Sequence, residues 1–171
     1  MKSGSKEITA PIIVLVCICL VASFLLAGVY QITSPIITQR EIDAANAAKM
    51  AVLPAGSTFT ENTECEKAEG VTNVYVADNG AGIAVSTNVK GMYAGLKLMV
   101  GVNDKGEITG INVLANEETA GIGSKALDQA YLDKYFGSKS ADAVDGITGA
   151  TYTSKGVKAA INAALEQFAA L

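Results

Sequence analysis

An uncharged run of 23 residues near the amino terminus constrains this chain more than any other feature. Residues 8–30, ITAPIIVLVCICLVASFLLAGVY, contain no acidic or basic side chain. As an α-helix the run would extend about 34 Å, enough to cross a hydrocarbon core about 30 Å thick. Pro11 falls in its first turn, where a missing N–H group costs little. The run therefore predicts a transmembrane helix.

A cleaved signal peptide is the alternative interpretation of this run. The apolar region of a signal peptide usually spans about 7–15 residues and ends at a small-residue cleavage site. This run is longer, and no cysteine follows the LLAG of Leu25–Gly28, so a lipoprotein-type processing site is not evident. We favour a retained anchor.

Flanking charge predicts the orientation of the span. Lys2, Lys6 and the α-amino group precede it, whereas the first basic residue after it is Arg40, beside Glu41 and Asp43. Positive charge favours the cytoplasmic side. Residues 1–7 should be a cytoplasmic amino terminus, and the remainder should lie on the extracytoplasmic side of the cell (inner) membrane.

Composition excludes several classes of site. The chain has 171 residues, which suits one domain plus an extra segment, and it has no histidine. Cys17 and Cys19 lie in the span, so Cys65 alone is left outside for a disulfide, zinc or iron–sulfur site. No calcium-loop spacing occurs, and the net charge of −4 is dispersed. We expect no metal and no nucleic-acid partner.

The segment after the span, residues 31–69, is interpreted as a membrane-proximal linker and helix. Pro35 marks a short exit from the membrane. Apolar residues then recur at helical spacing from Ile37 to Leu53, and Pro54 ends the pattern.

The remaining part, 70–171, has the pattern of an α+β domain with a largely antiparallel sheet flanked by helices. Asp104-Lys105-Gly106 predicts the tightest hairpin turn. β-Branched runs separated by turn residues predict four strands: Val71–Ala77, Gly82–Asn88, Gly95–Asn103 and Glu107–Asn116.

Two helices are predicted after the strands. The first spans Ser124–Gly137, with Ser124 as a cap and Gly137 as the stop, and the second spans Ser154–Leu171. An apolar stripe on the second predicts its core face: Val157, Ile161, Ala164, Leu165 and Phe168.

Catalytic sets are absent from this pattern. Without histidine there is no imidazole base and no Ser/His/Asp or Cys/His arrangement, so we expect no catalytic residue and no complete active site in this chain alone. Two glycine-containing loops remain, Glu118–Gly123 (ETAGIG) and Asp145–Thr151 (DGITGAT), and each precedes a predicted helix.

The free N–H groups at a helix start favour an anion such as a phosphate, so these loops could flank a phosphorylated cofactor. The alternative is plain capping, with Thr153 or Ser154 as the cap and with Gly121 and Gly123 as turn residues. Spacing alone favours capping.

The second loop resembles the flavin-transferase acceptor motif, an aspartate and two residues followed by Ser/Thr-Gly-Ala-Thr. Tyr152-Thr153-Ser154 resembles the usual continuation. The segment Lys97–Gly123 is similar to the one preceding this motif in the FMN-binding domain family of the Rnf G subunit and of its relative in sodium-translocating NADH:quinone reductases, the C subunit. The short chain favours the Rnf protein. Ala120 stands where the family commonly has proline.

The resemblance implies that FMN is joined covalently, through its phosphate, to the Thr151 hydroxyl. It implies that the transferase recognises the turn formed by Asp145, Thr148, Gly149 and Ala150. By the same resemblance, the residues bordering the flavin are Glu118, Thr119, Gly121, Ile122 and Gly123. No base in the chain suits activation of a threonine, so a separate flavin transferase would make the bond with FAD as donor.

The implied function is that of an electron-carrying membrane subunit. It would belong to an Rnf-type complex that couples ferredoxin:NAD electron transfer to Na⁺ or H⁺ translocation. The expected partners are the other subunits, the flavin transferase and membrane lipid. Two alternatives remain: an anchored FMN-binding protein serving another extracytoplasmic reductase, and an anchored module that binds an anionic ligand.

Overall fold

The computed structural model describes residues 4–171. The chain divides into two compact units, Met1–Asp43 and Ala44–Leu171. Most of helix α1 (Gly4–Val52) lies in the first unit. Its segment Pro11–Ile37 has a mean hydropathy of 3.1 and is unburied, so it is long and apolar enough to cross a membrane.

The predicted interruption at Pro35 is wrong, because α1 continues through this residue to Val52. A proline inside a helix removes one backbone donor, and the result is often a bend rather than an end. Two residues earlier, the Thr33 hydroxyl donates to the Val29 carbonyl at 2.8 Å, which adds a bond to this part of the helix.

The second unit is built on an antiparallel sheet with strand order β1-β2-β3-β4-β5. The four predicted strands and the hairpin between the last two are confirmed, with no end shifted by more than one residue. The sequence pattern missed β1, which is three residues long. The strands are β1 (Phe59–Glu61), β2 (Val71–Ala77), β3 (Gly82–Val89), β4 (Leu96–Asn103) and β5 (Ile108–Ala115).

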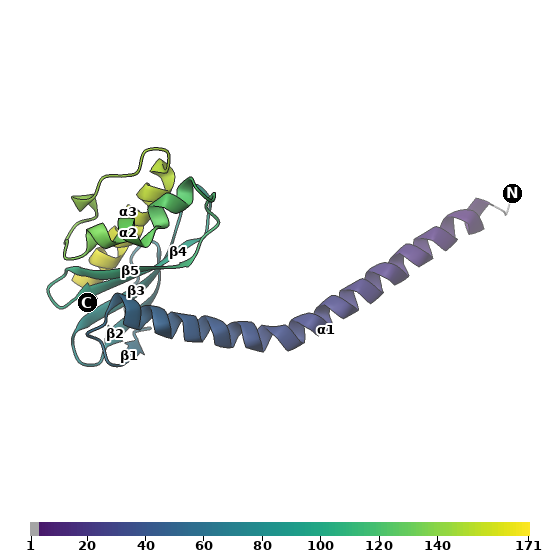
Figure 1. The fold of residues 1–171 in the computed structure, drawn as a ribbon. Helices are drawn as coiled ribbons and strands as arrows, with labels where there is room; N and C mark the ends of the chain where they lie inside the picture. Colours follow the sequence, from purple (N-terminus) through teal and green to yellow (C-terminus); the bar gives the residue numbers. More distant parts are fainter. Residues whose placement is uncertain (1–3) are drawn as a thin grey trace. The chain divides into compact units, whose positions relative to one another are not determined.

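Helix α3 (Thr151–Ala169) and the short helical segments cover one face of this sheet (Figure 1). The predicted apolar stripe of α3 is confirmed: Val157, Ile161 and Ala164 are fully buried, and Leu165 and Phe168 pack against them partly buried. The strand residues that complete this core are Ile83, Val85, Leu96, Leu98, Val100, Val102, Ile108 and Ile111.

The other face receives the last turns of α1, which belong to the second unit. Strand register places Ala84 beside Gly101 and Gly101 beside Gly110. A Cβ at Gly101 would collide with the Val52 carbonyl, and one at Gly110 would lie 2.7 Å from Val52 Cα. The small residues therefore form the groove that seats the end of α1.

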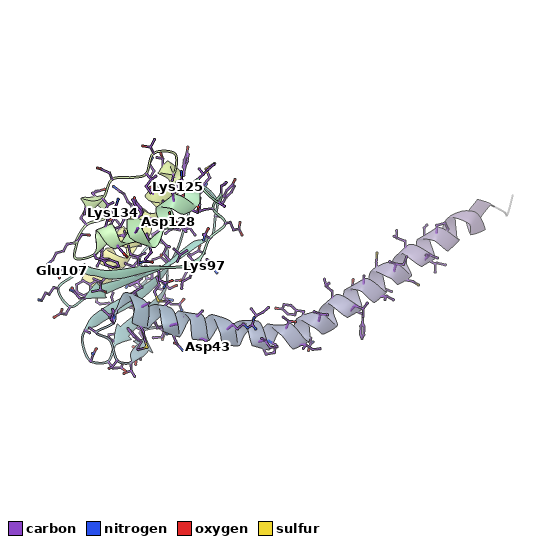
Figure 2. The ribbon with its side chains drawn as sticks, viewed as in Figure 1. Asp43, Lys97, Glu107, Lys125, Asp128 and Lys134 are labelled. Atoms are coloured by element: carbon purple, nitrogen blue, oxygen red, sulfur yellow. The ribbon has the colours of Figure 1, made fainter. Side chains whose placement is uncertain are left out.

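The single helix predicted over Ser124–Gly137 is wrong. The structure has η1 (Gly123–Leu127), α2 (Gln129–Leu132) and η2 (Asp133–Tyr135), followed later by η3 (Ala141–Ala143). Asp128 is extended, with φ −65° and ψ 136°, which interrupts the helical path. Lys125, Asp128 and Lys134 are exposed on these segments (Figure 2).

Candidate functional site

The two glycine-containing loops and the start of α3 meet at a pocket of about 310 Å³. This volume is at the lower end of the range of small-molecule sites, about 300–1,000 Å³. The pocket is lined by Met92, Tyr93, Glu118, Thr119, Ile122, Gly123, Gly149, Ala150, Tyr152 and Thr153.

Glu118 connects the three segments of the chain that line this pocket. Its Oε1 accepts a 2.9 Å hydrogen bond from the backbone N–H of Met92, and its Oε2 accepts a 2.6 Å bond from the hydroxyl of Thr153. Hydrogen bonds to a carboxylate are shorter and stronger than those between neutral groups. One side chain thus joins the β3–β4 connection, the loop after β5 and the first turn of α3.

Large apolar side chains stand exposed around the pocket. Met92 is 52% exposed, Tyr93 47%, Ile122 56% and Tyr152 64%, although buried core lies next to them. A cluster of exposed apolar side chains at a cavity is typical of a binding site. The two aromatic rings and the thioether are suited to contact with a flat, polarisable ligand.

The loop before α3 is held in one conformation by its own backbone and by α2. Gly149 has φ +87°, a region that residues with a Cβ rarely adopt. Ile147 N donates to Ser154 Oγ at 3.1 Å, and Tyr131 Oη donates to the Asp145 carbonyl at 3.1 Å. The turn is therefore preorganised on both sides.

Tyr131 is in turn supported by Tyr135 in the core. Their hydroxyls lie 3.2 Å apart and their rings pack edge to face at 5.8 Å. Burial, reinforced by the hydrogen bond with Tyr131, raises the pKa of the Tyr135 phenol well above its usual value near 10. The two phenols are linked in the core, and the bond from Tyr131 to the Asp145 carbonyl extends this support to the loop.

The hydroxyl groups of this region differ in access. Thr148 and Thr151 are exposed, whereas Thr153 and Ser154 are 1% and 2% exposed. The Thr153 hydroxyl donates a hydrogen bond to Glu118 Oε2, and the Ser154 hydroxyl oxygen accepts one from Ile147 N. Only the first two offer a hydroxyl that an external enzyme could reach without opening the fold.

The capping prediction for Thr153 and Ser154 is wrong. Helix α3 begins at Thr151, its N-cap position is Ala150, and no side chain caps it. The first bond along the helix runs from Ser154 N to the Ala150 carbonyl at 2.9 Å, so the amides of Thr151, Tyr152 and Thr153 have no acceptor within the helix. The helix start therefore has N–H groups without an acceptor within the helix, and its positive dipole end lies beside the pocket.

The described residues offer no cluster of three or more histidine, cysteine, aspartate or glutamate side chains suited to a metal ion. The pocket and the helix start instead suit an anionic organic group with a flat, partly apolar portion. The family model of the FMN-binding domain matches residues 91–166.

This match covers β4, β5, both loops of the site and most of α3, so the pocket lies within the part of the chain that is similar to the FMN-binding domain family.

Curated relatives resemble a larger part of the chain. The G subunit of the proton-translocating ferredoxin:NAD(+) oxidoreductase complex of Clostridium ljungdahlii is 27% identical over 87% of this chain and 85% of its own. The G subunit of the Na(+)-translocating complex of Acetobacterium woodii is 27% identical over 91% and 89%. The G subunit of the ion-translocating oxidoreductase complex of Methanosarcina acetivorans is 28% identical over 98% of both chains.

The structure brings part of the expected site residues to the pocket. Those on its wall are Glu118, Thr119, Ile122, Gly123, Gly149 and Ala150. Gly121, with φ +75°, lies outside the lining, as do Asp145 and Thr148 in the turn and Thr151 at the helix start.

Four further residues line the pocket that the sequence pattern did not predict there: Met92, Tyr93, Tyr152 and Thr153. Tyr152 and Thr153 directly follow the acceptor motif in the first turn of α3, and this position could have indicated that they line the pocket. Met92 and Tyr93 lie in the connection between β3 and β4, and nothing local to that segment indicates that it reaches the loop around Glu118.

Proposed function

We propose that this chain is the FMN-carrying membrane subunit of an Rnf-type complex, with FMN joined covalently to Thr151. The observation that carries the proposal is the position of Thr151. Its exposed hydroxyl lies at the first residue of α3, directly after two residues of the pocket wall, Gly149 and Ala150.

The residues of the site fit the two unlike parts of FMN. The free amides at the start of α3 and its dipole would stabilise a phosphate on Thr151. The exposed side chains of Tyr93, Tyr152, Met92 and Ile122 would contact the flat ring system.

The flavin supplies one- and two-electron transfer, and the protein supplies its position and its electrostatic surroundings. Thr151 would become a phosphoester through a separate flavin transferase, which uses FAD and releases AMP. The chain's part in that reaction is to present the turn Asp145–Ala150 in a fixed conformation. Gly149, Tyr131 and Ser154 hold it in the way described above.

The arrangement in the membrane is part of the proposal. Residues 8–30 span the membrane, and residues 1–7 are cytoplasmic. Residues 31–69 connect the span to the FMN-binding domain of residues 70–171, which is extracytoplasmic. Covalent attachment prevents loss of the cofactor on the extracytoplasmic side, where FMN from the cytoplasm could not replace it. Because residues 8–30 contain no charge, ion translocation would belong to other subunits of the complex.

Membership of a ferredoxin:NAD complex that moves Na⁺ or H⁺ is supported by relatives that match 87–98% of the chain. The second candidate is an anchored FMN-binding protein serving another extracytoplasmic reductase, because the family model covers the domain alone. Purification from native membranes with the other complex subunits supports the first candidate, whereas isolation of a flavin-bearing chain by itself supports the second.

Intact-mass measurement tests the attachment. The full chain, produced with a flavin transferase, should gain the mass of one FMN less one water, and the gain should survive denaturation. Thr151→Ala should lose it, while Thr148→Ser, a change that the motif permits at an exposed position three residues away, should keep it. Retention in Thr151→Ala would move the acceptor. A ligand released by denaturation would support the anionic-ligand module.

A further inference from the structure

We infer that Glu118 is a positioning residue with a second effect, which is to hold the midpoint potential of the bound flavin low. The inference rests on the proposed function. It combines the place of Glu118 in the pocket wall, its two hydrogen bonds and the absence of Glu118 from the ion pairs within Ala44–Leu171.

The carboxylate of Glu118 is built into the fold. A Cβ at Gly91 would collide with its Oε1, and one at Gly123 would lie 2.6 Å from its Oε2 and 2.9 Å from Thr153 Oγ1. Two glycines thus leave the space that the carboxylate occupies. The Met92 N–H and the Thr153 hydroxyl donate hydrogen bonds to this carboxylate, and these two bonds fix its position between the glycines.

The charge on this carboxylate has no ion-pair partner. Within Ala44–Leu171 the ion pairs join Lys139 to Glu107 and Lys158 to Asp142, and neither involves the pocket. The two donors to Glu118 are neutral groups. The pocket wall therefore carries a carboxylate that is not part of either ion pair.

A fixed negative charge acts unequally on the two redox states of a flavin. Reduction by two electrons with uptake of one proton adds one negative charge to the ring system. The carboxylate therefore disfavours the reduced state more than the oxidised state, and this lowers the midpoint potential. In a partly enclosed pocket the effect is screened less than on an open surface.

The first test measures the midpoint potential by titrating the full-length flavinylated chain in detergent with dithionite in the presence of mediator dyes. Glu118→Gln should shift the potential to a more positive value. Glu117→Gln is the matched control, since it removes the same charge from the neighbouring exposed position outside the pocket, and its potential should equal that of the parent.

Thr153→Val separates the effect of charge from damage to the pocket. It keeps the carboxylate and removes a neutral donor that spreads its charge, so the potential should shift to a more negative value. A positive shift in both Glu118→Gln and Thr153→Val would overturn the inference. An unshifted Glu118→Gln would also do so. Should Glu118→Gln fail to fold, the sign of the Thr153→Val shift decides.

A second measurement needs no flavin. In the full chain produced without the transferase, Glu118→Ala should speed hydrogen exchange at the Met92 amide about tenfold, because that amide loses its charged acceptor. Equal exchange in Glu118→Ala and the parent would overturn the positioning role. Intact mass separates the two proposals: an unflavinylated parent contradicts the proposed function, whereas a flavinylated chain with an unshifted potential contradicts only this inference.

Discussion

The Thr153 hydroxyl donates a 2.6 Å hydrogen bond to Glu118 Oε2 across 35 positions of the chain. Because Thr153 is in the first turn of α3 and Glu118 is in the loop after β5, this bond connects the acceptor motif to the other wall of the pocket. It also explains why Thr153 does not cap its own helix.

Thr153→Val should lower the free energy of unfolding of the unit Ala44–Leu171 by about 1–2 kcal/mol. The substitution keeps the buried volume and removes a donor to a charged acceptor. Denaturant unfolding of the full chain, followed by tyrosine fluorescence, measures the change. Thr148→Val, at an exposed site, should stay within about 0.5 kcal/mol of the parent, and equal losses in the two variants would contradict the role of the bond.

Gly149→Ala should reduce covalent flavin loading, because alanine is strained at φ +87° and the turn before Thr151 would change shape. The strain costs roughly 1–2 kcal/mol. Gly137→Ala is the matched control: its φ is +75°, and it likewise has open space around a Cβ. Both variants should lose similar stability. Loading measured by intact mass should fall only in Gly149→Ala, and an equal fall in both would point to instability alone.

Gly101→Ala should release the last turns of α1 from the sheet, since its Cβ would collide with the Val52 carbonyl. We expect a loss of about 2–4 kcal/mol, in the range of severe overpacking. Hydrogen exchange of the amides of residues 44–52 should accelerate. Thr109→Val, which removes only the hydroxyl bond to Val52 O, should cost about 1 kcal/mol. A larger effect in Thr109→Val than in Gly101→Ala would contradict the packing argument.

In Tyr135→Phe the free energy of unfolding should fall less steeply above pH 10 than it does in the parent. Burial first, and then the bond with Tyr131, raise the pKa of Tyr135 in the folded state. Above pH 10 the unfolded chain releases this proton while the folded chain keeps it, so the free energy of unfolding falls as pH rises. Thermal unfolding of parent and variant from pH 9 to 11 measures the difference in slope. Identical slopes would show that Tyr135 ionises as easily in the fold as in the unfolded chain.

Local pattern was sufficient for much of the fold. The four longer strands follow from β-branched runs between turn residues, and the core face of α3 follows from its apolar stripe, because burial of a face imposes the period of the element. The same pattern failed at Ser124–Gly137, where Asp128 adopts an extended conformation to suit the packing of α2. It also failed at Pro35, because a proline does not always end a helix.

The unbroken apolar span, the α+β pattern and the motif around Thr151 can each be recognised from consecutive residues. Which of these residues meet depends on the tertiary structure. Thr153 reaches Glu118, Met92 reaches the same carboxylate, and Gly101 receives Val52. Such contacts depend on strand register and on the path of the loops, and these are set by packing of the whole domain rather than by any local stretch.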